Sequence, residues 1–174
     1  MIGNDIIDLD TARMESNWRR KGYLQKIFTE SEQLLISGSV DPEIMVWCLW
    51  SMKEAAYKIY NRQTGIRSYM PLKLNCYDLE ITDHGRRGKV SCEGAIYFTE
   101  TTITKRYIHS SAVVYRNFFK QLILNIYDNN EEVGAQNPIC RDEYGLPFTT
   151  DKKTLQRLPA SISHHGRFFS HIAI

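Results

Sequence analysis

One helix constrains the fold of this chain more than any other segment. Asp41 followed by Pro42 is a strong helix start, because the aspartate side chain caps free amides and proline suits the first helical position. The apolar spacing after it predicts a helix over about 43–61 with much of its surface buried. Its apolar residues are Ile44, Trp47, Cys48, Ala55 and Ile59. We expect this helix at the centre of the fold.

The segments before it predict one strand and two further helices. Residues 2–9 are short and rich in β-branched residues, which indicates a buried strand. Residues 11–26 have helical spacing. The segment 29–32, Thr-Glu-Ser-Glu, matches a capping box and predicts a short helix to about Ile36, with Gly38 just past its end.

The pattern after the long helix is mainly that of strands. Strands are expected at 72–81, 89–98 and 107–115, a turn at 83–85, a helix at 116–127, a polar loop at 128–137, a turn at 144–147, and two short strands at 160–163 and 167–174 joined through 164–166. Helices followed by strands favour an α+β fold, with an antiparallel sheet packed on the long central helix, over a regular parallel α/β sheet.

Composition excludes several classes of protein. A chain of 174 residues suits a single domain, 1–174, and a formal charge of +2 is too small to imply nucleic-acid binding. The four cysteines, at 48, 76, 92 and 140, contain no CxxC pair, so buried or unreactive thiols are expected instead of zinc or disulfides. No apolar stretch approaches a membrane span, and the N-terminus lacks the pattern of a signal peptide. We expect a cytoplasmic protein without nucleic-acid or membrane partners.

The first candidate for chemistry is Asp5. An acid inside a buried apolar strand is costly unless it is paired, hydrogen-bonded or bound to metal. Asp8 and Asp10 follow, but side chains alternate along a strand, so Asp8 points away from Asp5 if the strand persists. The other interpretation makes Asp8 or Asp10 the cap of the next helix, and for Asp10 we favour it.

The second candidate is a carboxylate and an ammonium on the long helix. Glu54 and Lys58 are four residues apart and share one helical face with Trp50, and Tyr57 is their neighbour. The spacing equally suits an ordinary surface ion pair, and such pairs are common. The tryptophans nearby indicate that this face is at least partly buried.

The third candidate is the polar turn at 161–168, which contains Ser163, His164, His165 and Arg167. Hydroxyl, imidazole and guanidinium donors at a turn suit an anion such as a phosphate. A polar hairpin with a satisfied histidine is the alternative, and a Ser-His nucleophilic pair is a weaker one. Two carboxylates from separate elements, together with phosphate oxygens, form the hard oxygen shell that Mg²⁺ prefers.

Four motifs in register resemble those of the 4′-phosphopantetheinyl transferase superfamily. They are a G-x-D-I element, an F/L-T-E-x-E element, a W-x-x-K-E-A-x-x-K helix and a S-I-S-H strand end, found at 3–6, 28–32, 50–58 and 161–164. Their order is similar to that in the short holo-acyl-carrier-protein synthases. The resemblance implies the 4′-phosphopantetheinyl transferase-like fold.

It also implies an activity: transfer of the 4′-phosphopantetheine arm of coenzyme A to a serine of an acidic acyl or peptidyl carrier protein, with Mg²⁺, releasing 3′,5′-ADP. Glu54, or a water on the metal, would take the serine proton. The roles carried over by position are metal binding for Asp5 and Glu54 with Asp8 in support, pyrophosphate binding for Lys58, and coenzyme A contacts for Ser163, His164 and Lys53. The basic cluster Arg13, Arg19, Arg20 and Lys21 is a candidate docking surface for the carrier.

The chain departs from the family pattern at a few positions. Asn4 replaces an apolar residue, Leu146 stands where a lysine is usual, and the segment 84–137 is longer than the short enzymes need. Those enzymes are trimers, and the extra segment leaves the oligomeric state of this chain open. Two alternatives remain: another Mg²⁺-dependent, nucleotide-handling transferase, or a degenerate member that binds carrier protein without modifying it. Leu146 favours the latter, whereas intact Asp5, Glu54, Lys58 and His164 count against it.

Overall fold

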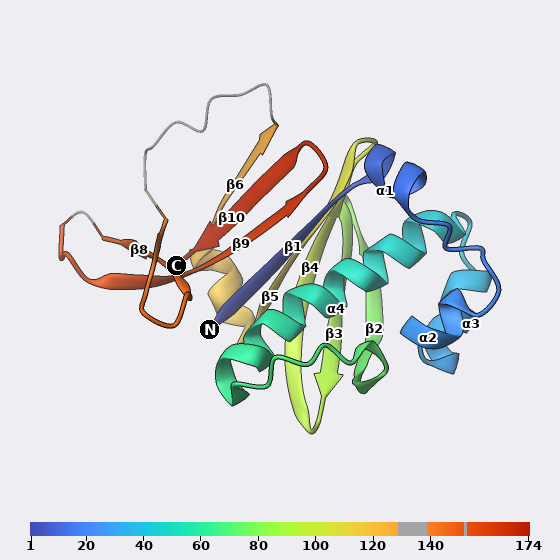
Figure 1. Ribbon diagram of the computed structural model, residues 1–174, viewed down its shortest axis with the longest axis horizontal. Helices are drawn as coiled ribbons and strands as arrows, with labels where there is room; N and C mark the ends of the chain where they lie inside the picture. The colour runs from blue at the N-terminus through green and yellow to red at the C-terminus, as the bar shows by residue number, and fades with distance from the viewer. Residues whose placement is uncertain (129–138, 152) are drawn as a thin grey trace.

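The computed structural model describes residues 1–128, 139–151 and 153–174 (Figure 1). It contains two five-stranded sheets, and all paired strands in both are antiparallel. The first has the order β1-β5-β4-β3-β2 and the second the order β6-β10-β9-β8-β7. The strands are β1 (Ile2–Asp8), β2 (Leu74–Thr82), β3 (Gly85–Cys92), β4 (Ala95–Ile103), β5 (Tyr107–Val113), β6 (Ile123–Asp128), β7 (Cys140–Arg141), β8 (Pro147–Thr150), β9 (Arg157–His165) and β10 (Phe168–Ala173).

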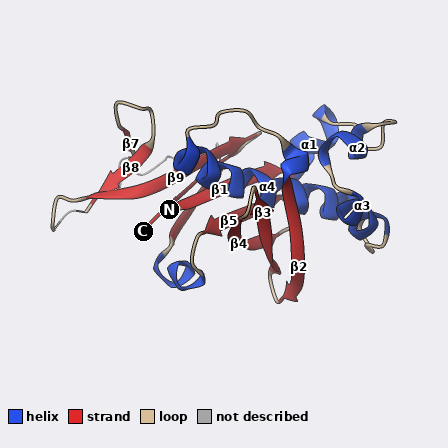
Figure 2. Cartoon of the chain, turned by 90° about the horizontal axis from the view of Figure 1, so that it is seen from below, coloured by secondary structure: helices blue, strands red, loops and turns tan. Residues whose placement is uncertain are grey.

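One long helix covers a face of the first sheet, and shorter helices gather at one end of it (Figures 1 and 2). The helices are α1 (Leu9–Glu15), α2 (Tyr23–Ile27), α3 (Glu30–Ser37) and α4 (Pro42–Thr64), with two 3₁₀ helices, η1 (Pro71–Lys73) and η2 (Arg116–Gln121). The predicted α+β class, with an antiparallel sheet on a long central helix, is confirmed.

Helix α4 begins where the Asp41-Pro42 signal predicted it. The Asp41 carboxylate accepts a hydrogen bond from the Ile44 amide at 3.1 Å, and Pro42 occupies the first turn. The helix runs for 23 residues and ends at Gly65, whose φ of 72° suits the left-handed conformation of a helix C-terminus. Residues 45–49 in its first half are fully covered. This buried surface is the core that joins α4 to the first sheet.

The capping box that begins α3 is also confirmed. The Thr29 amide donates to Glu32 at 2.8 Å, and the Glu32 amide donates to the Thr29 hydroxyl at 3.4 Å. Gly38 caps the other end of α3.

Close backbone contact between β1 and α4 depends on Gly3. A Cβ built at this position would lie 2.1 Å from the carbonyl oxygen of Ala55, so no other residue fits without a backbone shift. Side chains alternate along β1, so Asp5 shares the helix-facing side with Gly3, and its carbonyl oxygen accepts a hydrogen bond from Ser51 of α4 at 3.4 Å. The intervening Asn4 points to the second sheet and donates to Ser170 at 2.9 Å.

Side chains of β9 hold the outer edge of β1, which β9 adjoins in Figure 1. Three alternate residues of β9 each accept a hydrogen bond from a β1 amide. The pairs are Asn4 with Ser161 Oγ (3.1 Å), Ile6 with Ser163 Oγ (3.2 Å) and Asp8 with His165 Nδ1 (3.0 Å). The β1 amides at the edge of the first sheet therefore donate to side chains of β9. These bonds join the two sheets along β1.

Two predicted elements are divided in the structure. The expected helix over 11–26 is two short helices, because α1 ends at Glu15 and Gly22, at φ 81°, starts α2 separately. The expected strand over 89–98 is the end of β3 and the start of β4, separated by a turn at Glu93 and Gly94, both at positive φ.

One predicted element has the wrong type. The apolar spacing over 116–127 predicted a helix, but only 116–121 is helical, as η2, and 123–128 forms β6. Pairing with β10 decides the conformation of this segment. Of the expected loop over 128–137, Asp128 belongs to β6 and the rest lies outside the described residues.

All four cysteines are free thiols, as expected: Cys48, Cys76 and Cys92 are buried and Cys140 is exposed. Among the described residues, no helix combines the length and apolar character that a membrane crossing requires.

Candidate active site

The structure brings Asp5 of β1 together with Glu54 and Lys58 of α4. The Lys58 ammonium lies 3.8 Å from Asp5 Oδ1, and Glu54 is one helical turn before it on the same face. The two acids are 49 positions apart in sequence and meet because Gly3 lets β1 approach the α4 backbone.

The electrostatics of this group follow from its burial. Burial raises the pKa of Asp5, against the opposing effects of Lys58 and of the hydrogen bond from Ser163. Burial, and then the charge of Asp5, raise the pKa of Glu54 to about 7. Burial also lowers the pKa of Lys58 from its usual value, although both acids oppose this. Two nearby carboxylates with one ammonium therefore leave negative charge that favours a further cation.

The donor set fits a magnesium ion. Within the described part of the chain, the Glu54 carboxylate has neither a hydrogen bond nor an ion pair that meets normal geometry, although it faces a second acid. No group of three or more His, Cys, Asp or Glu side chains suited to a metal occurs among the described residues. Two carboxylates with room for other oxygens suit Mg²⁺, which usually takes one or two protein carboxylates together with water and substrate phosphates.

Lys58 also joins three elements. Its ammonium donates to the carbonyl oxygens of Asn4 at 2.6 Å and Ile162 at 3.1 Å, so it ties α4 to both β1 and β9. An ammonium has three donors, and these two bonds leave one beside the acid pair. Lys58 is thus held in place by backbone while its charge faces Asp5.

Ser163 belongs to the same group. Its hydroxyl donates to Asp5 Oδ1 at 2.9 Å and accepts from the Ile6 amide at 3.2 Å. Next to it, His164 is exposed and His165 half-buried, and both border a cavity of about 310 Å³ that also contains Asp5.

His165 was part of the candidate turn at 161–168, but the family resemblance gave it no role. Its Nδ1 accepts the Asp8 amide, so the neutral ring carries its proton on Nε2, which is free to donate. Two tryptophans and a tyrosine, Trp47, Trp50 and Tyr23, form the apolar wall of the cavity. The buried Trp47 indole N–H has no partner among the described residues. The cavity thus has imidazole rings as well as apolar surface beside Asp5.

The structure does not bring Asp8, which was expected to support the metal, to the acid pair. Arg167 binds it through Nε and one terminal nitrogen, both at 3.1 Å, and the Arg167 amide donates to it at 3.1 Å. Burial alone would raise the pKa of Asp8, but these hydrogen bonds outweigh it and the pKa is lowered. Asp8 also accepts from the Asp10 amide and caps α1, a role the sequence favoured for Asp10.

The structure does not place Lys53, an expected coenzyme A contact, beside the acid pair. Its side chain is fully buried on another face of α4, where it forms an ion pair with Glu32 at 2.7 Å. The ammonium also donates to the carbonyl oxygens of Ile27 at 2.8 Å and Pro71 at 2.9 Å. All three donors are used inside the protein, so Lys53 has none to offer a ligand.

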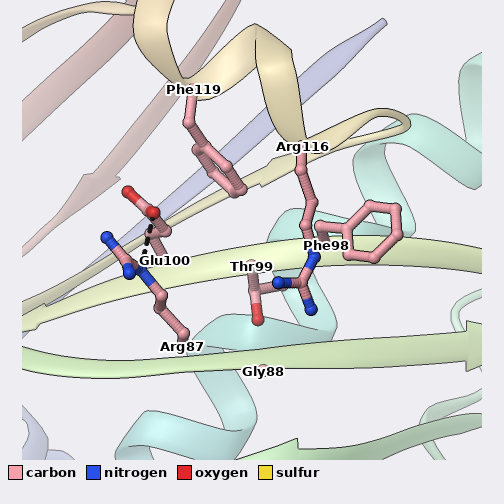
Figure 3. Close-up of a pocket in the computed structure, with 7 residues that line it drawn as sticks. All are labelled: Arg87, Gly88, Phe98, Thr99, Glu100, Arg116 and Phe119. Atoms are coloured by element: carbon pink, nitrogen blue, oxygen red, sulfur yellow. Dashed lines mark hydrogen bonds and ion pairs between the residues drawn. The ribbon is translucent and has the colours of Figure 1, made fainter. Parts of the chain in front are cut away.

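A second cavity, of about 200 Å³, lies on the first sheet between β3, β4 and η2 (Figure 3). Its single acid, Glu100, is paired with Arg87 at 2.9 Å, and the Arg116 guanidinium lies 4.9 Å from the centre of the Phe98 ring. An acid that is paired with arginine does not attract a metal ion, so this cavity is not a candidate metal site.

Two comparisons with known proteins found a match, and a third found none. A sequence model described as the 4′-phosphopantetheinyl transferase superfamily matches residues 1–115, which include Asp5, Glu54 and Lys58 but not Ser163 or His164. Among solved structures, the chain is similar to the holo-[acyl-carrier-protein] synthase of Helicobacter pylori in complex with coenzyme A, at 15% identity and a TM-score of 0.30, with 100% of this chain and 98% of that chain covered. No curated protein matches the sequence.

Proposed function

The chain belongs to the 4′-phosphopantetheinyl transferase superfamily, and on this premise we propose that it transfers the 4′-phosphopantetheine arm of coenzyme A to a serine of an acyl or peptidyl carrier protein. The reaction depends on Mg²⁺ and releases 3′,5′-ADP. The observation that carries the proposal is the approach of a buried acid, Asp5, and a half-buried one, Glu54, to one another beside a fixed ammonium.

Asp5 and Glu54 would hold the magnesium ion in this proposal. When bound, the ion neutralises charge on the pyrophosphate of coenzyme A and on the leaving phosphate. Lys58, fixed by two carbonyl oxygens, adds a positive charge at the same place without having to reorganise. Ser163 holds Asp5 in orientation through its hydroxyl.

The bond changes of the proposed reaction are simple. The carrier serine oxygen attacks the β-phosphorus of coenzyme A, and the bridging bond to the departing 3′,5′-ADP breaks. Glu54, or a water held beside it, would accept the serine proton. His164 and His165 border the cavity beside Asp5 and donate to phosphate oxygens.

We propose that the whole chain, 1–174, acts as one domain. Asp5 comes from the first sheet, whereas Ser163 and His164 come from the second, and Lys58 bonds to a carbonyl of each. The proposed site therefore requires both sheets.

Mass spectrometry of an apo carrier protein tests the function directly. Incubation with coenzyme A, Mg²⁺ and this protein should add one phosphopantetheine arm to the carrier serine. Asp5→Ala and Glu54→Ala should abolish the addition, while Glu80→Ala, which removes an exposed acid of β2, should leave it unchanged. Circular dichroism of each variant checks that the fold is retained.

Three outcomes would contradict the proposal. Full transfer by either acid variant would exclude the metal assignment. A wild-type protein that binds the carrier without modifying it would be the degenerate member, and one that binds ATP in preference to coenzyme A would be a different nucleotide-handling transferase.

A further inference from the structure

Tyr69 lies over the same face of α4 as the candidate site, although it was not singled out from the sequence. It follows the end of α4, in the segment that leads to η1. Its ring contacts Trp50 edge-on, with centroids 5.7 Å apart, and Tyr57 in the same manner at 4.9 Å. These contacts fix the position of the ring from two sides.

The helix geometry sets what lies under that ring. Trp50 and Tyr57 are two turns apart on α4, and Glu54 lies between them on the same face. A ring that touches both Trp50 and Tyr57 therefore lies over Glu54. In agreement, after burial itself, the charges of Glu54 and then Asp5 raise the pKa of Tyr69, which keeps the phenol protonated and able to donate.

The Tyr69 hydroxyl is buried beside the Glu54 carboxylate, and in the described part of the chain its contact with that carboxylate falls short of normal hydrogen-bond geometry. Buried hydroxyl groups are normally paired, because leaving one unpaired costs free energy. The ring contacts alone would be satisfied equally well by phenylalanine. Ring packing therefore does not explain why this residue is a tyrosine. The polar groups that could bind its hydroxyl are the carboxylates of Glu54 and Asp5.

We propose that Tyr69 is a positioning residue for Glu54: its hydroxyl donates a hydrogen bond to the Glu54 carboxylate when a divalent cation is held between Asp5 and Glu54. This inference rests on the proposed metal site. Carboxylates that bind metals are themselves usually hydrogen-bonded by neighbouring groups, which fixes the orientation of the ligand oxygen. Tyr69 is a neutral donor held in place by its ring, so it can orient Glu54 without neutralising it.

The test is a direct titration of the protein with Mn²⁺, a probe for hard oxygen sites, followed by electron paramagnetic resonance in the absence of substrates. Tyr69→Phe keeps the ring contacts and removes only the hydroxyl, and we expect it to weaken Mn²⁺ binding about 10-fold to 100-fold. Tyr57→Phe is the matched control, because it removes a hydroxyl from the other ring of the same contact, and it should bind like the wild type.

Transfer kinetics give an independent readout. Raising the Mg²⁺ concentration should restore most of the kcat of Tyr69→Phe, so the variant would differ mainly in its Mg²⁺ requirement. Without cation, Tyr69→Phe should melt at the temperature of the wild type or above it, because the substitution removes a buried hydroxyl that lacks a good partner. Tyr69→Ala, which also removes the ring contacts, should lower the melting temperature as well.

The outcomes separate this inference from the proposed function. If the wild type fails to bind Mn²⁺, the metal role of Asp5 and Glu54 is excluded, and the proposed role of Tyr69 is excluded as well. If the wild type binds and Glu54→Gln does not, but Tyr69→Phe binds as tightly as the wild type, only the role of Tyr69 is overturned. A lower melting temperature for Tyr69→Phe with unchanged affinity would make the hydroxyl structural, which also rejects the proposal.

Discussion

At the scale of single residues, Glu54 lowers the stability of the metal-free fold at neutral pH. Its pKa in the folded protein, about 7, is above the usual 4.5, because the carboxyl is buried and faces Asp5. Protonation therefore favours the folded state, and the stability it contributes is complete below pH 4.5 and lost as the pH rises through 7. In the absence of metal, Glu54→Gln should be more stable than the wild type at pH 8 by on the order of 2 kcal/mol.

Urea unfolding at pH 8 and at pH 4 measures this difference, which should disappear at the lower pH. Glu80→Gln, at an exposed site on β2, is the control and should change stability little at either pH. Equal stability of Glu54→Gln and the wild type at pH 8 would contradict the raised pKa.

The sequence predicted which acids lie together better than it predicted the residues around them. Asp5 and Glu54 were predictable because an acid in a buried strand and an acid beside tryptophans both require a partner. The burial of Lys53 was not predictable, because neighbouring positions of a helix point in different directions and its partner Glu32 comes from α3. Tyr69 carried no signal, since its importance comes from where the chain returns after α4.

At the scale of elements, the contact between β1 and α4 decides whether the acids meet, and Gly3 controls it. Gly3→Ala would bring a Cβ to 2.1 Å from the Ala55 carbonyl oxygen, which is backbone and cannot rotate away. We expect β1 to be displaced, with a loss of about 1–3 kcal/mol of stability and a larger loss of activity, measured by urea unfolding and carrier modification. Gly38→Ala, at the end of α3, is the control with negative φ, and should have a smaller effect. Wild-type activity in Gly3→Ala would show that the acids tolerate displacement.

The elements that sequence predicted well are those with local signals at both ends. Helices α3 and α4 carry caps that act within one turn, and both were located to within a few residues. The segment 116–127 has an apolar spacing that suits a helix, but half of it pairs with β10, some 45 residues later. Local spacing contains no information on such a distant partner, so this part of the second sheet was not predictable.

At the scale of the whole molecule, the formal charge of +2 conceals a basic cluster next to the cavity beside Asp5. Ser16 and Tyr23 border that cavity, and Arg19 and Arg20 lie between them in sequence, both exposed. The Arg20 guanidinium lies 5.3 Å from the centre of the Tyr23 ring, which holds its charge near the opening. An acidic carrier attracted to these arginines would bring its serine to the proposed site.

Charge reversal tests this docking surface. Arg19→Glu with Arg20→Glu should lower kcat/KM for the carrier at least about 10-fold at low salt, because electrostatic attraction acts mainly on the rate of encounter. The KM for coenzyme A should change little, and the defect should shrink in about 0.5 M salt, where such attraction is screened. The control for overall charge is the double variant Lys105→Glu with Arg116→Glu. It makes the same change in net charge at two other exposed sites. If both double variants lose carrier activity equally, net charge governs the encounter, and the cluster at α1 and α2 is not the docking surface.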